Sequence, residues 1–127
     1  MRIAISVEIK GGVDSVAAQL FGRCPHFALV DLEGREVKAI EIVDNPYYGH
    51  HQPGQVPAFI KELNADVMLS GGMGRRAIEF FEQMGIQAAT GADGTVRTAL
   101  ESYLGGNLTG AEPCAESVEH SKKGLHG

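Results

Sequence analysis

A thiol and an imidazole lie two residues apart at Cys24 and His26, directly after Arg23. Thiolate and imidazole groups are ligands for zinc, copper and iron–sulfur centres. If this segment is extended, the two side chains point to the same side and can face one ligand. Arg23 would favour the thiolate by its charge. The alternative is a small buried thiol followed by a histidine at the edge of a strand.

A closed metal site needs about four ligands, so a site at Cys24 and His26 requires partners from elsewhere in the chain. His50 and His51 lie in a polar loop predicted over residues 44–54, where an imidazole is either an accessible ligand or an idle surface group. We expect these two histidines to complete the metal ligands. The remaining candidates are Met73, Cys114, His120 and His126, and the spacing of the last three matches no zinc-finger pattern.

The segment Gly71–Arg76 (Gly-Gly-Met-Gly-Arg-Arg) stands where a predicted strand turns into a predicted helix. Backbone N–H groups at a helix N-terminus attract anions, and glycine lets a ligand approach the backbone. Two arginines in the first turn add positive charge, although the helix dipole favours acidic residues there. We expect Arg23, Gly72, Gly74 and Arg75 to hold the charge of an anionic ligand, against the alternative of an ordinary turn with solvated arginines. The spacing matches neither common nucleotide fingerprint.

The bulk properties exclude several classes of protein. A chain of 127 residues predicts one domain, and a net charge of −5 argues against a general nucleic-acid binder. The sequence contains no run of about 18 apolar residues, so we expect no membrane-spanning helix. The two cysteines suggest no disulfide framework, so we expect a cytoplasmic protein.

Hydrophobic periodicity predicts a β-hairpin followed by alternating strands and helices. We expect strands over residues 2–9, 27–32, 36–43, 66–70 and 86–90, helices over 55–63, 75–84 and 95–104, and a short helical turn within 13–20. This order predicts an α/β fold with a mixed sheet, in which right-handed crossovers make the later strands parallel to the first. Residues 107–127 break the pattern and indicate an irregular or mobile tail.

The order of these segments resembles the dinitrogenase iron–molybdenum cofactor biosynthesis family, which includes NifX-like and NafY-like carriers and the C-terminal domain of NifB-type proteins. The resemblance spans residues 1–106, which we take as one domain, and leaves 107–127 outside it. The residues that carry it are Ile3–Ile5, Phe21–Asp31, Gly71–Ala77, Ile86, Gly91 and Thr95–Leu100.

The resemblance implies a ribonuclease H-like motif, with a five-stranded mixed sheet, an antiparallel second strand and helices on both faces. It also implies a non-enzymatic carrier of a metal–sulfur cluster, of the iron–molybdenum cofactor or iron–sulfur type, that meets metallocluster donor and acceptor proteins. Within it, Cys24 and His26, with His50 or His51, would ligate the cluster, and Gly72, Gly74 and Arg75 would hold its charge. Two other functional hypotheses remain. One is a phosphate- or nucleotide-binding enzyme that uses Gly71–Arg76, and the other is an interaction module whose histidines and cysteines have no functional role.

Overall fold

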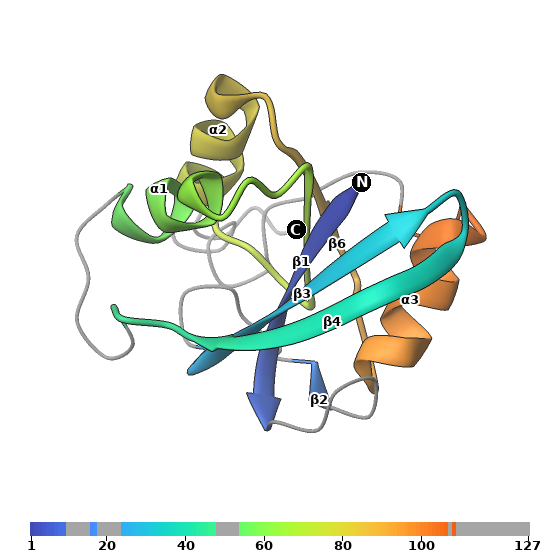
Figure 1. Ribbon diagram of the computed structural model, residues 1–127. Coiled ribbons are helices and arrows are strands. Elements are labelled where there is room, and N and C mark those ends of the chain that lie inside the picture. Colours follow the sequence, from blue (N-terminus) through green and yellow to red (C-terminus); the bar gives the residue numbers. More distant parts are fainter. Residues whose placement is uncertain (10–15, 18–23, 48–53, 107, 109–127) are drawn as a thin grey trace, which may run out of the picture.

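The computed structural model describes residues 1–9, 16–17, 24–47, 54–106 and 108 of the chain (Figure 1). The elements follow one another as a hairpin and then as alternating helices and strands. In chain order they are β1 (Arg2–Ile9), β2 (Val16–Ala17), β3 (His26–Glu33), β4 (Glu36–Asp44), α1 (Gln55–Glu62), β5 (Val67–Ser70), α2 (Arg75–Met84), β6 (Gln87–Thr90) and α3 (Val96–Leu104).

Five strands form the body of a mixed sheet in the order β4-β3-β1-β5-β6, and the two-residue β2 pairs with β1 beside this path. β3 runs antiparallel to β1 and β4, whereas β1, β5 and β6 are mutually parallel neighbours. The carboxyl ends of β1, β5 and β6 therefore meet at one end of the sheet, which we call the carboxyl edge. The predicted five-stranded mixed sheet with an antiparallel second strand is confirmed.

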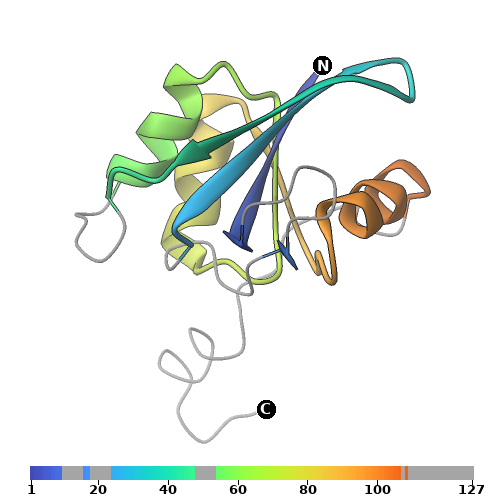
Figure 2. The same ribbon diagram turned by 60° about the horizontal axis from the view of Figure 1, so that its bottom comes forward.

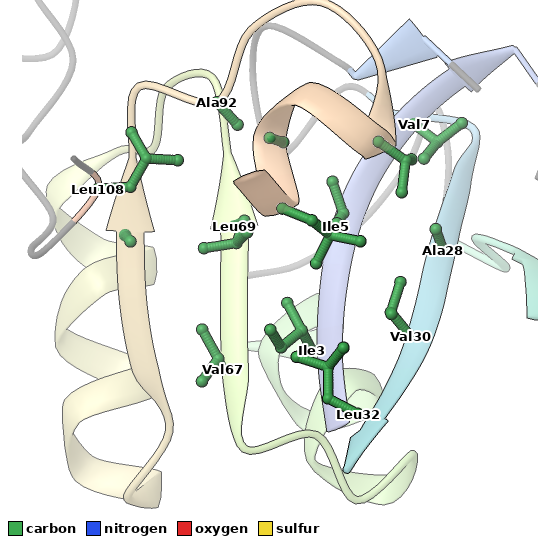
Figure 3. Close-up of a cluster of buried hydrophobic side chains, with 14 residues drawn as sticks. Ile3, Ile5, Val7, Ala28, Val30, Leu32, Val67, Leu69, Ala92 and Leu108 are labelled. Atoms are coloured by element: carbon green, nitrogen blue, oxygen red, sulfur yellow. The ribbon is translucent and has the colours of Figure 1, made fainter. Parts of the chain in front are cut away.

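Helices cover both faces of this sheet, as predicted. Figure 2 shows α1 and α2 on one side and α3 on the other. Because side chains alternate along a strand, Ile3, Ile5 and Val7 of β1 face α3, whereas Ala4 packs under α1 and α2. Figure 3 shows Ile5, Val30 and Leu69 projecting from three neighbouring strands into the cluster beneath α3.

Two apolar clusters result, one on each face. The α3-side cluster contains Ile3, Ile5, Val7, Ala28, Val30, Leu32, Val67, Leu69, Ala89, Ala92, Val96, Ala99, Leu100 and Leu108. The α1/α2-side cluster contains Ala4, Cys24, Phe27, Leu29, Val56, Ile60, Ala65, Met68, Met73, Phe81, Ile86 and Ala88. Burial of this apolar surface on both faces is the main force that holds the helices on the sheet.

Arg2 joins the start of β1 to its neighbours at the end opposite the carboxyl edge. Its Nε donates to Asp31 Oδ1 of β3 at 2.8 Å, and its Nη1 donates to the Leu63 carbonyl after α1 at 2.7 Å. The Arg2 guanidinium lowers the pKa of Asp31 below its ordinary value, chiefly through this hydrogen bond. The pair therefore fixes the register of β1 and β3 at the far end from the candidate site.

β4 is the outermost strand next to β3, and most of its residues are exposed. Its exposed side chains include Glu36, Lys38 and Glu41, and the β3–β4 register shifts between Asp31 and Leu32. Among the described residues, no helix is long and apolar enough to cross a membrane.

The predicted helical turn within residues 13–20 is wrong at Val16–Ala17, which form β2. These two residues pair antiparallel with β1 in the registers Val7–Ala17 and Ile9–Val16. Pairing with an existing strand supplies backbone hydrogen bonds that a short isolated helical turn must form by itself, and helix nucleation is costly. The rest of that segment lies outside the described residues, as does the predicted tail except for Leu108, which is buried in the α3-side cluster.

Candidate functional site

The Gly71–Gly74 turn leads from the carboxyl edge into α2. It follows β5, whose four residues are all buried because the strand lies in the middle of the sheet. Its start is anchored to the loop after β6, since Gly91 N donates to the Gly71 carbonyl at 3.0 Å and Ala92 N to the Ser70 carbonyl at 3.1 Å. The turn thus sits where the ends of two parallel strands meet, which is where α/β sheets commonly bind ligands.

The N-terminus of α2 has no side-chain cap. Its N-cap residue is Gly74, and no acidic residue stands in its first turn. Arg75 and Arg76 are exposed there. The first N–H groups of a helix have no partner within the helix and carry partial positive charge, so an uncapped start with two cations attracts an anion.

The start of α3 also lies at the carboxyl edge, but unlike α2 it has a side-chain cap. Thr95 Oγ1 accepts from Thr98 N at 3.3 Å and Thr98 Oγ1 accepts from Thr95 N at 3.0 Å, which is a capping box. The sequence therefore supplies a local cap to one helix at this edge and leaves the other with free donors.

Gly74 is not required by the backbone geometry of the turn. Its φ of −69° and ψ of 155° are open to any residue, and a Cβ placed on it would meet no atom of the described residues within 4 Å. The space beside the start of α2 is therefore open, which suits the close approach of a ligand and makes Gly74 a useful position for a steric test.

Cys24 is fully buried in the α1/α2-side cluster. Burial raises the pKa of its thiol to about 11, because desolvation disfavours the thiolate. The Ser6 hydroxyl is the largest influence in the opposite direction, although its oxygen makes no geometrically formed hydrogen bond. At neutral pH Cys24 is a protonated thiol, whereas a metal ligand must be a thiolate.

Hydrogen bonds to Asn45 hold the Cys24 segment in place. Asn45 Nδ2 donates to the Cys24 carbonyl at 2.9 Å, and Asn45 N donates to the Pro25 carbonyl at 2.9 Å. Asn45 Oδ1 accepts from Tyr47 N at 2.9 Å. Asn45 itself is buried; its Nδ2 joins the two segments, whereas its Oδ1 fixes the turn within its own segment.

The structure places Cys24 and His26 on different faces of the sheet. β3 begins only at His26, and Pro25 lies in a bend, so the extended geometry that would align the two side chains is not found. His26 stands opposite Val7, whose side chain belongs to the α3-side cluster, whereas Cys24 packs in the α1/α2-side cluster. The His26 Nδ1 lies 3.0 Å from Asp44 Oδ1, which orients the imidazole.

Arg23, His50 and His51 lie outside the described residues, as do Cys114, His120 and His126. Within the part of the chain that the structure describes, no three His, Cys, Asp or Glu side chains are grouped to hold a metal ion. The described part of the candidate site therefore consists of the uncapped start of α2 at the carboxyl edge and the buried thiol of Cys24. The metal ligands named from the sequence stay a prediction.

Two buried serines near this edge were not singled out from the sequence. Ser6 and Ser70 are both fully buried, and neither hydroxyl has a hydrogen-bond partner among the described residues. A signal existed, because each is a polar residue within or at the end of a strand that is otherwise apolar on that face.

Comparison with known families identifies the chain's relatives. The profile of the family described as "Dinitrogenase iron-molybdenum cofactor" matches residues 1–106. The chain belongs to this family. The resemblance seen in Phe21–Asp31 and Gly71–Ala77 is thereby confirmed, and the match includes all of β1 to α3 and the glycine-rich turn. The family name relates these proteins to the iron–molybdenum cofactor of dinitrogenase.

Individual relatives match this chain over most of their lengths, and two solved structures share its fold. An uncharacterized protein of Methanocaldococcus jannaschii, MJ0580, is 29% identical over 110 residues, which make up 85% of this chain and 89% of the relative. The crystal structure of PH0822 is 38% identical with a TM-score of 0.75, and the match covers 92% of this chain and 99% of that one. The apo form of the orange protein from Desulfovibrio gigas is 28% identical with a TM-score of 0.76, over 88% of this chain and 93% of that one.

Proposed function

We propose that this protein binds and carries a metal–sulfur cluster of the iron–molybdenum cofactor or iron–sulfur type, and that it is not an enzyme. The observation that carries the proposal is the start of α2. This helix leaves the carboxyl edge through a glycine-rich turn, has no side-chain cap, and presents Arg75 and Arg76 to solvent. In a member of a family named for the iron–molybdenum cofactor, such a terminus suits an anionic cluster.

The role of a carrier fits this kind of site because a carrier must release its cargo. Backbone N–H groups and exposed arginine charges attract an anion strongly enough to hold it but form no covalent bond to the metal. The Gly72 and Gly74 positions let the cluster approach the backbone, and Arg75 balances its charge; Arg23 is proposed to add charge from the preceding segment. Metallocluster donor and acceptor proteins in the cytoplasm are the corresponding partners.

We further propose Cys24, His26, His50 and His51 as the side chains that ligate the cluster's metal. Because Cys24 and His26 lie on different faces of the sheet, joint ligation requires the segment that holds them to rearrange. Cys24 is buried and protonated in the described state, so its ligation requires the segment held by Asn45 to open and the thiol to lose its proton. Ligation through Cys24 would thus be slower than the first electrostatic contact at α2. The cluster would first be captured electrostatically at the start of α2 and would then be retained by ligation through Cys24.

The test is anaerobic reconstitution with isolated iron–molybdenum cofactor and, separately, with an iron–sulfur cluster assembled from ferrous iron and sulfide. Visible absorption of the desalted protein measures uptake. We expect uptake by the wild type, a loss of about tenfold in affinity when Arg75 and Arg76 are both replaced by Ala, and little change for Arg35→Ala. Arg35 lies on the β3–β4 turn at the opposite end of the sheet, where its Nη2 donates to the Leu104 carbonyl, so Arg35→Ala controls for loss of a positive charge away from the proposed site.

Equal uptake by the wild type and the Arg75→Ala, Arg76→Ala variant would refute the site at α2. Equal uptake by a Cys24→Ala, His26→Ala variant would refute only the proposed metal ligands. Gly74→Ala adds a steric test, because a Cβ at this position meets no described atom within 4 Å in the free protein and would compete with a bound cluster.

The alternative is a phosphate- or nucleotide-binding enzyme that uses the same Gly71–Arg76 turn, since an uncapped helix N-terminus also suits a phosphate. Calorimetric titration with nucleotides and sugar phosphates separates the two functions. Heat that is lost in Arg75→Ala, without any uptake of cluster by the wild type, would favour the alternative.

A further inference from the structure

Ser6 and Ser70 each place a hydroxyl group in the protein interior without a geometrically formed hydrogen bond among the described residues. The Ser6 hydroxyl acts on the neighbouring Cys24 thiol, whose pKa it lowers. Both serines are 0% exposed. Buried side-chain polar atoms in folded proteins are nearly always hydrogen-bonded, because an unpaired one loses its bonds to water without replacement. The third buried polar residue, Asn45, follows this rule with bonds from both ends of its amide.

The two serines are neighbours on the same face of the sheet. β1 and β5 are parallel and pair in the register Ile5–Leu69, so Ser6 and Ser70 are the next pair toward the carboxyl edge. The side chains of Ala4 and Met68, two residues earlier on each strand, belong to the α1/α2-side cluster. By strand alternation both hydroxyls therefore project under α1 and α2, from strands about 4.8 Å apart.

The row of hydroxyl residues continues to the next strand. Ser70 is paired with Thr90 of β6, and Thr90 is likewise two residues beyond a member of the α1/α2-side cluster, Ala88. Three adjacent parallel strands thus carry a hydroxyl at the same level and on the same face. The two members in the middle of the sheet are the ones left unpaired.

Hydrogen-bond donors follow directly after Ser70 along the chain. The chain turns directly after Ser70 through Gly71–Gly74 into α2, whose first N–H groups have no side-chain cap and whose first turn carries no acid. Arg75 and Arg76 add two positive charges. The nearby Cys24 is neutral at pH 7, because burial raises its pKa, so no negative group among these residues competes for the donors.

We propose that the Ser6 and Ser70 hydroxyls form the floor of a binding site for a small tetrahedral oxyanion, or its sulfur-substituted equivalent, whose roof is the start of α2. The anion reaches them when the turn beyond Gly71 moves away from the sheet, which also takes the buried Met73 side chain out of the α1/α2-side cluster. This inference deepens the proposed function and rests on it for location. It specifies the chemistry: the ligand must offer several acceptor atoms at once to O–H and N–H donors, either as a free anion or as the terminal oxygen or sulfur atoms of a bound cluster.

The first experiment uses the free anions. Calorimetric titrations with molybdate, tungstate, sulfate and phosphate at constant ionic strength compare the wild type with Ser6→Ala, Ser70→Ala and the control Ser102→Ala, which lies on α3 at the other face of the sheet. We expect at least one anion to bind the wild type and the control equally, and each floor variant to bind it about tenfold or more weakly, as for loss of a hydrogen bond to a charged group.

Thermal unfolding gives a readout that a purely structural serine would not produce. Without anion, Ser6→Ala and Ser70→Ala should unfold at the same temperature as the wild type or a higher one, because each removes an unpaired buried hydroxyl. With saturating anion the order should reverse, because only the wild type gains the full stabilisation from binding. An order that is the same in both buffers would overturn the proposal.

The cluster reconstitution of the previous section distinguishes the two sources of the ligand. Serine-dependent uptake of cluster without binding of free anions identifies the cluster's terminal atoms as the ligand and supports the proposal. Serine-dependent binding of free anions without uptake of cluster supports the hydroxyl site and refutes the carrier function. Cluster uptake that is unchanged in both serine variants, with no binding of free anions, overturns the hydroxyl site and leaves the carrier function standing.

Discussion

The buried thiol of Cys24 should make the stability of the folded protein fall in alkaline solution. The perturbation is a rise of pH from 7 to 11, compared between the wild type and Cys24→Ala. Burial raises the pKa of Cys24 from 9.0 to about 11. The folded state therefore holds the thiol proton at pH values where the unfolded state releases it, so this contribution is complete below pH 9 and is lost between pH 9 and pH 11.

The magnitude follows from the two pKa values. The loss of free energy of unfolding is about 1.4 kcal/mol at pH 10 and approaches about 2.7 kcal/mol above pH 11, since one unit is worth about 1.36 kcal/mol. Cys24→Ala removes this term at every pH but also removes a packed sulfur, at a cost on the order of 1 to 2 kcal/mol. The wild type should thus be the more stable protein at pH 7 and should lose that advantage by about pH 11.

Urea denaturation followed by far-ultraviolet circular dichroism, with reductant present, measures both proteins at pH 7, 9, 10 and 11. Tyrosine and lysine titrations are common to the two chains, so the difference between their free energies of unfolding isolates Cys24. A difference that does not change with pH would mean that the thiol has an ordinary pKa. The reasoning that burial raises the pKa of Cys24 would then be refuted.

Three further predictions concern the scaffold around the site, each measured as a change in the free energy of unfolding. Arg2→Ala should lose about 1 to 2 kcal/mol with its half-exposed ion pair and its bond to the Leu63 carbonyl, and Lys38→Ala, in a more exposed pair with Glu36, should lose less than about 0.5 kcal/mol. Equal losses would contradict the role given to Arg2. Thr95→Ala should lose about 1 kcal/mol through the capping box of α3, with cluster uptake unchanged; a loss of uptake would extend the site to α3. Gly85→Ala should lose about 1 kcal/mol because Gly85 has a φ of +76°, whereas Gly74→Ala, at an extended φ, should change stability by less than that, and the reverse order would refute the backbone argument.

The sheet and its helices could be predicted because periodicity and turn residues agreed along most of the chain. Alternation at Ile3, Ile5 and Val7 indicated β1, and Gly85, which ends α2 in the left-handed conformation, marked a helix end. The βα order then determined which strands are parallel. The pairing of Val16–Ala17 with β1 could not be predicted, because a two-residue strand has no period of its own and exists only through its partner.

The position of the glycine-rich turn at the start of a helix was predictable from the sequence, whereas the relative positions of Cys24 and His26 were not. The glycine-rich turn with Arg75 and Arg76 stands at the start of a helix, as its composition indicated. The pairing of Cys24 with His26 depended on an extended segment, and Pro25 prevents it, so the two residues lie on different faces. The unpaired state of Ser6 and Ser70 is a property of three-dimensional burial, which no spacing along the chain expresses.

The charged outer strand β4 has a consequence for how copies of this protein meet. An edge strand presents unpaired backbone groups on which another chain can add a strand, and natural sheets guard against aggregation with charges and irregular register. β4 has both features: the charged residues Glu36, Lys38 and Glu41, and a register shift in its pairing with β3. At high concentration the molecules should therefore resist fusing their sheets into larger assemblies, and the carboxyl edge should stay open to other molecules.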